Sequence, residues 1–156
     1  MTRTTTPRAR AHDQAAELIA DECLAVRIRL LNRTITGIYD DALRPLGLTT
    51  GQLNILAVVA RQSDISPGEI AQLLNMEKST VSRTVERMRS HGWLNVAAAS
   101  GRKQMLTLTG SGKRLLADSL PAWKKAQAEA GALLGQRGAT SILSTGNTVW
   151  SRIRNT

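Results

Sequence analysis

The sequence predicts a mostly α-helical (α+β) protein, in which long helices at both ends flank a compact middle of short helices and one β-hairpin. Three observations carry this prediction: helical periodicity from about residue 13, helix-capping signals in the middle, and two short apolar runs around a Ser-Gly turn. The length of 156 residues suits one domain with extensions and is enough to bury a core.

Residues 13–43 are expected to form one long helix, because the stretch lacks proline and repeats apolar side chains at helical spacing. These side chains fall on two stripes roughly 120° apart. One stripe comprises Ile19, Cys23, Val26 and Leu30, and the other Leu24, Ile28, Leu31, Ile35, Ile38 and Ala42. Two apolar faces need two partners, and a second copy of the chain is the economical candidate for one of them.

The middle of the chain carries signals for two short helices joined by a tight turn. Thr49 offers an N-cap for a further helix that begins just after it, runs to about residue 61 and precedes this pair. Ser66-Pro67-Gly68-Glu69 has the composition of a capping box with proline at N1, which predicts a helix from Pro67 to about residue 74. The helical pattern breaks at 75–77 and resumes over 78–91, so the pair is expected to form a helix-turn-helix.

The C-terminal half is predicted to contain a hairpin and then two helices. Gly92 is expected at the C′ position, followed by strands over 93–96 and 105–108 around the Ser-Gly tip. Beyond Thr109, Ala- and Leu-rich stretches to about residue 134 and over 140–153 are expected to be helical, with a separation at residues 135–138.

The charge of the chain is +9, with a pI near 11.0, and it is concentrated in one segment. Residues 78–114 hold eight Lys or Arg against Glu86 alone, whereas residues 13–77 are net acidic. This localisation indicates a polyanionic partner. Only 3% of the residues are aromatic, which disfavours platforms for stacking single-stranded bases and favours duplex nucleic acid.

Several other classes are excluded by the inventory of residues. A lone Cys23 rules out an internal disulfide, no zinc-ligand spacing is present, and no metal or cofactor is expected. No apolar run reaches the length of a membrane span and the N-terminus lacks a signal peptide, so a reducing cytoplasm is expected. Residues 111–113 only partly match a phosphate-binding loop, and His12 and His91 lack a nucleophile arrangement, so catalysis is not expected.

This order of elements resembles the MarR family of winged helix-turn-helix transcriptional regulators. The resemblance is carried by residues 43–49 with Gln52, 70–74, 79–83 with Val85, 92–94, and 108–109 with Gly112. It implies a homodimer, and usually a repressor, whose recognition helix enters the major groove and whose wing meets the minor groove. The expected parts are a disordered or arm-like segment 1–12, a dimerisation domain 13–45 plus 113–156 of long N- and C-terminal helices, and a DNA-binding winged helix-turn-helix 46–112.

In the helix over 78–91, Val81, Val85 and Met88 share an apolar face that is expected to dock on the core. The residues expected to contact DNA from this helix are Ser79, Thr80, Ser82, Arg83, Arg87 and Arg89. Arg83 can bind guanine O6 and N7, while Arg87 and Arg89 suit phosphates. Glu86 either accepts from a cytosine amine or tethers a neighbouring arginine.

The wing is expected to contribute Arg102 and Lys103. The family usually carries an Asp that braces an Arg here, and this chain instead reads Ala99-Ser100-Gly101 before Arg102. Arg102 can insert into a narrow minor groove or clamp a phosphate, and both alternatives stay open. The arginines at the N-terminus could form a DNA-reaching arm, although short polar termini are more often disordered.

The family resemblance also implies a switch by a small-molecule effector such as a phenolic or aromatic carboxylate. The candidate pocket residues are Arg27, Arg33, Tyr39 and Trp93, with Trp123 as a further contributor. Cys23 is expected to pack in an apolar stripe. The alternative is a peroxide sensor, since one branch of the family pairs such a Cys with a Tyr of the partner subunit. The other functions weighed are a sequence-tolerant architectural DNA binder and a basic protein adsorbed to anionic membrane.

Overall fold

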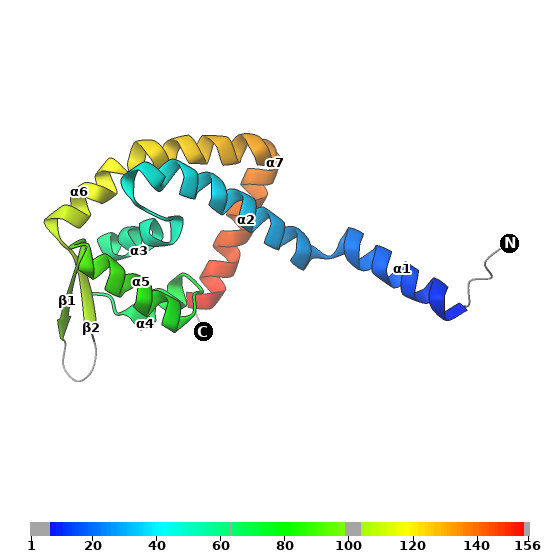
Figure 1. Cartoon of the computed structure of the whole chain (residues 1–156), viewed down its shortest axis with the longest axis horizontal. Coiled ribbons are helices and arrows are strands. Elements are labelled where there is room, and N and C mark those ends of the chain that lie inside the picture. The colour runs from blue at the N-terminus through cyan, green and yellow to red at the C-terminus, as the bar shows by residue number, and fades with distance from the viewer. Residues whose placement is uncertain (1–6, 63, 99–103, 155–156) are drawn as a thin grey trace. The chain divides into compact units, whose positions relative to one another are not determined.

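The computed structural model describes residues 7–62, 64–98 and 104–154 (Figure 1). It confirms the expected class, a mostly helical α+β fold with a helix-turn-helix and a two-stranded sheet between longer helices. The elements are α1 (Pro7–Glu22), α2 (Leu24–Leu43), the 3-10 helix η1 (Arg44–Leu46), α3 (Thr50–Arg61), α4 (Pro67–Leu73), α5 (Lys78–Ser90), β1 (Leu94–Ala98), β2 (Gln104–Leu108), α6 (Gly110–Asp118) and α7 (Leu120–Arg154). The chain divides into two units, Met1–Gly37 and Ile38–Thr156, a division that differs from the domains expected by role.

The first unit holds α1 and the beginning of α2, which are separated at Cys23. The prediction of one continuous helix is therefore wrong at this residue. The backbone bonds across the interruption are long, 3.3 Å from Cys23 N to Ile19 O and 3.2 Å from Arg27 N to Cys23 O, so the helix is stretched here. α1 begins at Pro7, so residues 7–12 are helical rather than disordered, whereas residues 1–6 of the segment expected to be disordered or arm-like lie outside the described residues.

Apolar side chains of the first unit are exposed on both predicted stripes. Leu24 is 76% exposed and Ile28 is 63% exposed, although both are large aliphatic residues. The full set of exposed large apolar residues here is Leu18, Ile19, Leu24, Val26, Ile28, Leu30 and Leu31. Large apolar side chains exposed in such number are typical of a protein interaction site.

The second unit is built around one apolar core that collects residues from α2 through β2. Its largest fully buried side chains come from α2, α3, α4, α5 and β2: Leu43, Ile55, Leu56, Ile70, Val81, Met88 and Leu106. Both predicted N-caps are confirmed as capping boxes. Thr49 accepts from Gln52 N at the start of α3, and Ser66 accepts from Glu69 N at the start of α4.

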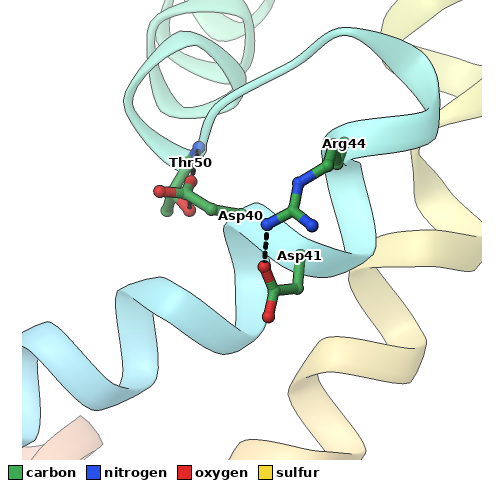
Figure 2. A network of polar contacts seen from close by, with 4 residues as sticks. All are labelled: Asp40, Asp41, Arg44 and Thr50. Atoms are coloured by element: carbon green, nitrogen blue, oxygen red, sulfur yellow. Dashed lines mark hydrogen bonds and ion pairs between the residues drawn. The ribbon is translucent and has the colours of Figure 1, made fainter.

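The last turns of α2 hold the beginning of α3 through a carboxylate (Figure 2). Asp40 Oδ1 accepts from the backbone N of Thr50 at 2.7 Å and from its hydroxyl at 2.6 Å. The neighbouring Asp41 pairs with Arg44, and both of these side chains are well exposed. Asp40 therefore caps α3 from outside that helix, in addition to the cap from Thr49.

The hairpin is antiparallel, with Leu94 opposite Leu108 and Ala98 opposite Gln104. The predicted strands are confirmed with shifted ends, since β1 begins one residue later and both strands extend toward the tip. Leu106 N donates to Ile65 O at 2.9 Å, so β2 is also tied to the segment before α4. This bond holds the hairpin against the helix-turn-helix.

The C-terminal helices have two interruptions, of which one was predicted. α6 ends at Asp118 with Ser119 as its C-cap, and Pro121 follows as the second residue of α7, a break that the side-chain spacing did not predict. The separation predicted at residues 135–138 is present at Gly135, whose φ of 67° and ψ of 161° turn the ribbon of α7 sharply (Figure 1). This conformation is essentially restricted to glycine.

Candidate nucleic-acid interface

Helices α4 and α5 meet across a tight turn at residues 74–77. Asn75 takes the left-handed conformation with φ of 49°, which asparagine tolerates better than most residues, and Met76 N donates to Ala71 O at 2.8 Å. Val81, Val85 and Met88 are buried in the core, as the periodicity predicted. One face of α5 is thus fixed, which leaves the opposite face directed away from the core.

The six predicted contact residues of α5 are all exposed: Ser79, Thr80, Ser82, Arg83, Arg87 and Arg89. The structure therefore brings them together on one helix. Among the described residues, the guanidinium groups of Arg83 and Arg87 make no hydrogen bond or ion pair. Their guanidinium groups are available to an external acceptor such as a base edge or a phosphate.

Arg89 is held differently, because Glu86 binds it through two hydrogen bonds. Arg89 Nε donates to Glu86 Oε2 at 3.0 Å and Arg89 Nη2 donates to Glu86 Oε1 at 2.6 Å. These hydrogen bonds lower the pKa of the Glu86 carboxyl below its ordinary value. Of the two roles considered for Glu86, the structure thus has the arginine tether. The pair contributes no net charge, so the unpaired guanidinium groups described on α5 are those of Arg83 and Arg87.

The N-terminus of α5 is arranged unlike those of its neighbours. α3, α4 and α6 each begin with a Thr or Ser side chain that accepts from a backbone amide, whereas Glu77 before α5 makes no such bond. The first amides of a helix lack partners within the helix, and its N-terminus carries partial positive charge. The exposed hydroxyls of Ser79 and Thr80 lie in this same turn.

The hairpin packs beside α5 in the same unit (Figure 1). Arg102 and Lys103, the residues predicted for the wing tip, lie outside the described residues. A cavity of about 350 Å³ opens between α5 and the hairpin, with Ser82, Arg89 and Gln104 among its lining residues.

The four residues predicted for an effector pocket are divided between the two units. Arg27 and Arg33 belong to the first unit, where Arg27 donates to Asp21 O at 2.9 Å. In the second unit the Tyr39 hydroxyl donates to Gln127 Oε1, and burial raises the pKa of this phenol. Trp93 packs against the core and stacks on His91, with ring centroids 4.7 Å apart.

A larger cavity of about 460 Å³ lies between the end of α3, the end of β2 and α6. Its lining comprises Val59, Ala60, Thr107, Leu108, Lys113 and Leu116. The walls are mostly aliphatic, and Lys113 supplies the one charge of this lining. Sequence reasoning did not single out this set, because its members are far apart in the chain and have no shared motif.

Cys23 is partly exposed at the interruption between α1 and α2. Within the part of the chain that the structure describes, no helix is long and apolar enough to cross a membrane. The same residues hold no group of three His, Cys, Asp or Glu side chains arranged to bind a metal ion.

A packed helix-turn-helix, a basic outward face on its second helix and a hairpin beside that helix define a winged helix-turn-helix protein. The MarR family model matches residues 46–103. The chain is also 32% identical to the transcriptional regulator MosR of M. tuberculosis, with 84% of this chain and 98% of that chain aligned and a TM-score of 0.72. The chain belongs to the MarR family of transcriptional regulators.

Three further matches place the chain among its relatives. MosR has also been solved in complex with DNA, and that structure matches with a TM-score of 0.69 over 83% of this chain and 99% of that one, at 32% identity. The regulator YwoH of Bacillus subtilis is 28% identical over 76 residues, which span 49% of this chain and 56% of YwoH. BpsR of Bordetella bronchiseptica, whose DNA binding is regulated by 6-hydroxynicotinic acid, shares the fold at 20% identity, with a TM-score of 0.71 and coverage of 82% and 94%.

Proposed function

We propose that the protein is a homodimeric transcriptional regulator that binds a pseudo-palindromic duplex DNA site through α5 and the hairpin. The observation that carries this proposal is the outward face of α5, which presents Arg83 and Arg87 without partners among the described residues. The uncapped N-terminus of α5 and the short side chains of Ser79 and Thr80 allow close approach to a phosphate backbone. The DNA complex of MosR supports the same conclusion.

The homodimer is supported by apolar side chains that the chain leaves exposed. Besides those of α1 and α2, α7 exposes Trp123, Leu133, Ile142, Leu143, Val149 and Trp150. Small oligomers are mostly two-fold dimers, and a two-fold dimer presents two copies of α5 to one duplex. We therefore assign dimerisation to the long N- and C-terminal helices, residues 13–45 and 113–156, and DNA binding to residues 46–112.

We further propose that a small amphipathic anion, such as a phenolic or aromatic carboxylate, controls DNA binding. The cavity bounded by α3, β2 and α6 offers aliphatic walls and the ammonium of Lys113. BpsR, which shares the fold, responds to such a molecule. Repression in the cytoplasm is the outcome that family membership favours, and oxidation of Cys23 is the alternative trigger.

The experiment that tests this function is selection of duplexes from a random library by the purified protein. A regulator should prefer its selected site over bulk duplex by roughly 10³ or more at physiological salt. An architectural DNA binder, the second candidate, should show little preference, and that result would overturn the proposal.

Two arginine variants separate the roles of the α5 residues. Arg83→Ala should cost about 1–3 kcal/mol on the selected site and relax base preference, because a base contact is lost. Arg87→Ala should weaken binding to all duplexes evenly and lower the salt slope by about one per protomer, as expected for a phosphate contact. Equal effects of both variants on every sequence would contradict the assignment of Arg83 to base recognition.

A further inference from the structure

The beginning of α6 is bonded directly to the backbone that follows the recognition helix α5. The Thr109 hydroxyl lies 2.7 Å from Gly92 O and 3.2 Å from Trp93 O, and the Ser111 hydroxyl donates to Gly92 O at 2.6 Å. Thr109 N also donates to Trp93 O at 3.1 Å. We call these four residues, Gly92, Trp93, Thr109 and Ser111, the α5–α6 junction.

The donor protons of both hydroxyls have acceptors at this junction. A hydroxyl has one proton to donate and can accept two bonds. Thr109 Oγ1 accepts from Gly112 N at 3.0 Å as the N-cap of α6, and it lies 2.9 Å from Ser111 Oγ. The two protons are thus shared among Gly92 O, Trp93 O and the other hydroxyl, so each side chain couples α6 to the end of α5.

The backbone of Gly112 in α6 also lies very close to the backbone of Trp93. A Cβ added at Gly112 would lie 2.1 Å from Trp93 O, a separation that real Cβ atoms essentially never show. Gly92 itself has a φ of 71°, which ends α5 in the left-handed conformation. The segment that follows α5 and the first turn of α6 therefore cannot move closer together without a clash.

From this geometry we infer that Thr109 and Ser111 are positioning residues that fix the orientation of the recognition helix relative to α6. This inference rests on the proposed DNA-binding function and adds a role for two residues that need not touch DNA. α5 has 13 residues and is therefore roughly 20 Å long. A rotation of about 10° at its C-terminus moves its N-terminus by roughly 3.4 Å, the rise of one base pair.

Loss of the junction is therefore expected to relax the spacing at which two copies of α5 read two half-sites. α6 continues into α7, which carries the exposed apolar side chains assigned to the dimer. In a two-fold dimer, the range of distances that the two recognition helices can take depends on how rigidly each helix is attached to the interface. With a loose attachment, each helix can still bind its half-site, but the dimer no longer distinguishes neighbouring spacings.

The test uses the full-length protein and the duplex selected from the random library, remade with one base pair inserted or removed between the half-sites. The variants are Thr109→Val, Thr109→Ser and Ser111→Ala. Thr49→Val is the matched control, because Thr49 is likewise a threonine N-cap that accepts from the N3 amide, but of α3. Both Thr109→Val and Thr49→Val should lose the stability contributed by one N-cap. A change in spacing preference that occurs in Thr109→Val alone is therefore due to positioning and not to lower stability.

Wild type is expected to prefer the selected spacing by about tenfold or more over its neighbours. Thr109→Val should reduce this ratio to about twofold, Ser111→Ala should reduce it partly, and Thr109→Ser and Thr49→Val should keep it. If Thr109→Val and Ser111→Ala keep the wild-type ratio, the positioning role is wrong even though DNA binding stands. If wild type shows no preference for any duplex, the proposed function fails first.

Amide hydrogen exchange of the DNA-free protein gives a second readout, which also serves if Thr109→Val folds poorly. In Ser111→Ala the end of α5 and the beginning of α6 should exchange faster than in wild type, while α3 is unchanged. Unchanged exchange at both helix ends would overturn the inference without reference to DNA.

Discussion

The close approach at Gly112 makes one substitution unusually informative. In Gly112→Ala the new Cβ would lie 2.1 Å from Trp93 O and 3.0 Å from Trp93 C. To restore an ordinary contact of about 3.3 Å, the two backbones must separate by roughly 1.2 Å. That movement breaks the 3.1 Å bond from Thr109 N to Trp93 O and the longer bond of the Thr109 hydroxyl to the same oxygen.

Each lost hydrogen bond costs about 1 kcal/mol, and forcing extra volume into a packed site costs about 1–3 kcal/mol. Alanine recovers about 1 kcal/mol through its higher helix propensity. The expected net loss is therefore about 2–4 kcal/mol in the free energy of unfolding.

Urea denaturation at one fixed protein concentration measures this loss, since the stability of the proposed dimer would depend on concentration. Gly110→Ala is the control in the same turn, because its added Cβ meets nothing nearer than the flexible end of Arg114 at 3.6 Å. This control should be neutral or slightly stabilising. If both variants unfold within about 0.5 kcal/mol of each other, the argument from close approach is refuted.

Three further predictions follow from individual side chains. Asp40→Ala should lower the free energy of unfolding by about 1–3 kcal/mol, because Thr50 loses its acceptor. Asp41→Ala removes only an exposed ion pair and should change the free energy of unfolding by less than about 0.5 kcal/mol. Similar values for the two variants in urea denaturation would contradict the capping role of Asp40. Glu86→Gln releases the guanidinium of Arg89 for a phosphate contact, so the slope of DNA affinity against salt concentration should steepen by about one per protomer in titrations at several salt concentrations. An unchanged slope would be inconsistent with the tether. The single tyrosine, Tyr39, should ionise with a midpoint above 10.0 in an absorbance titration, and a midpoint at or below 10.0 would argue against its burial. Because the folded state holds the phenol proton more tightly, the contribution of Tyr39 to stability is present below pH 10.0 and declines as the pH rises through the folded pKa.

Local signals made the middle of the chain predictable. The capping box at residues 66–69 and the glycine at 92 act within a few residues of themselves, so the sequence contains both partners of each interaction. The buried face of α5 follows from side-chain spacing for the same reason. The outward face and its arginines then follow as the remaining side of a helix.

Interactions between distant residues could not be predicted in this way. Asp40 caps a helix that begins ten residues later, and Thr109 bonds to Gly92 across the whole hairpin. Neither pairing leaves a periodic or local pattern in the sequence. The interruption at Cys23 was missed because stretched backbone bonds have no signature in side-chain spacing, and the larger cavity arises only when α3, β2 and α6 pack together.

In the proposed homodimer, the part of α7 beyond the turn at Gly135 would make the structure of the chain depend on protein concentration. Every side chain from residue 140 to residue 152 is exposed, including Trp150, so this segment buries little against its own chain. A helix of about 15 residues is marginal in water without packing. Helix content in this segment is therefore expected to fall on dilution, which would make the amount of regulator in the cell a determinant of its C-terminal structure.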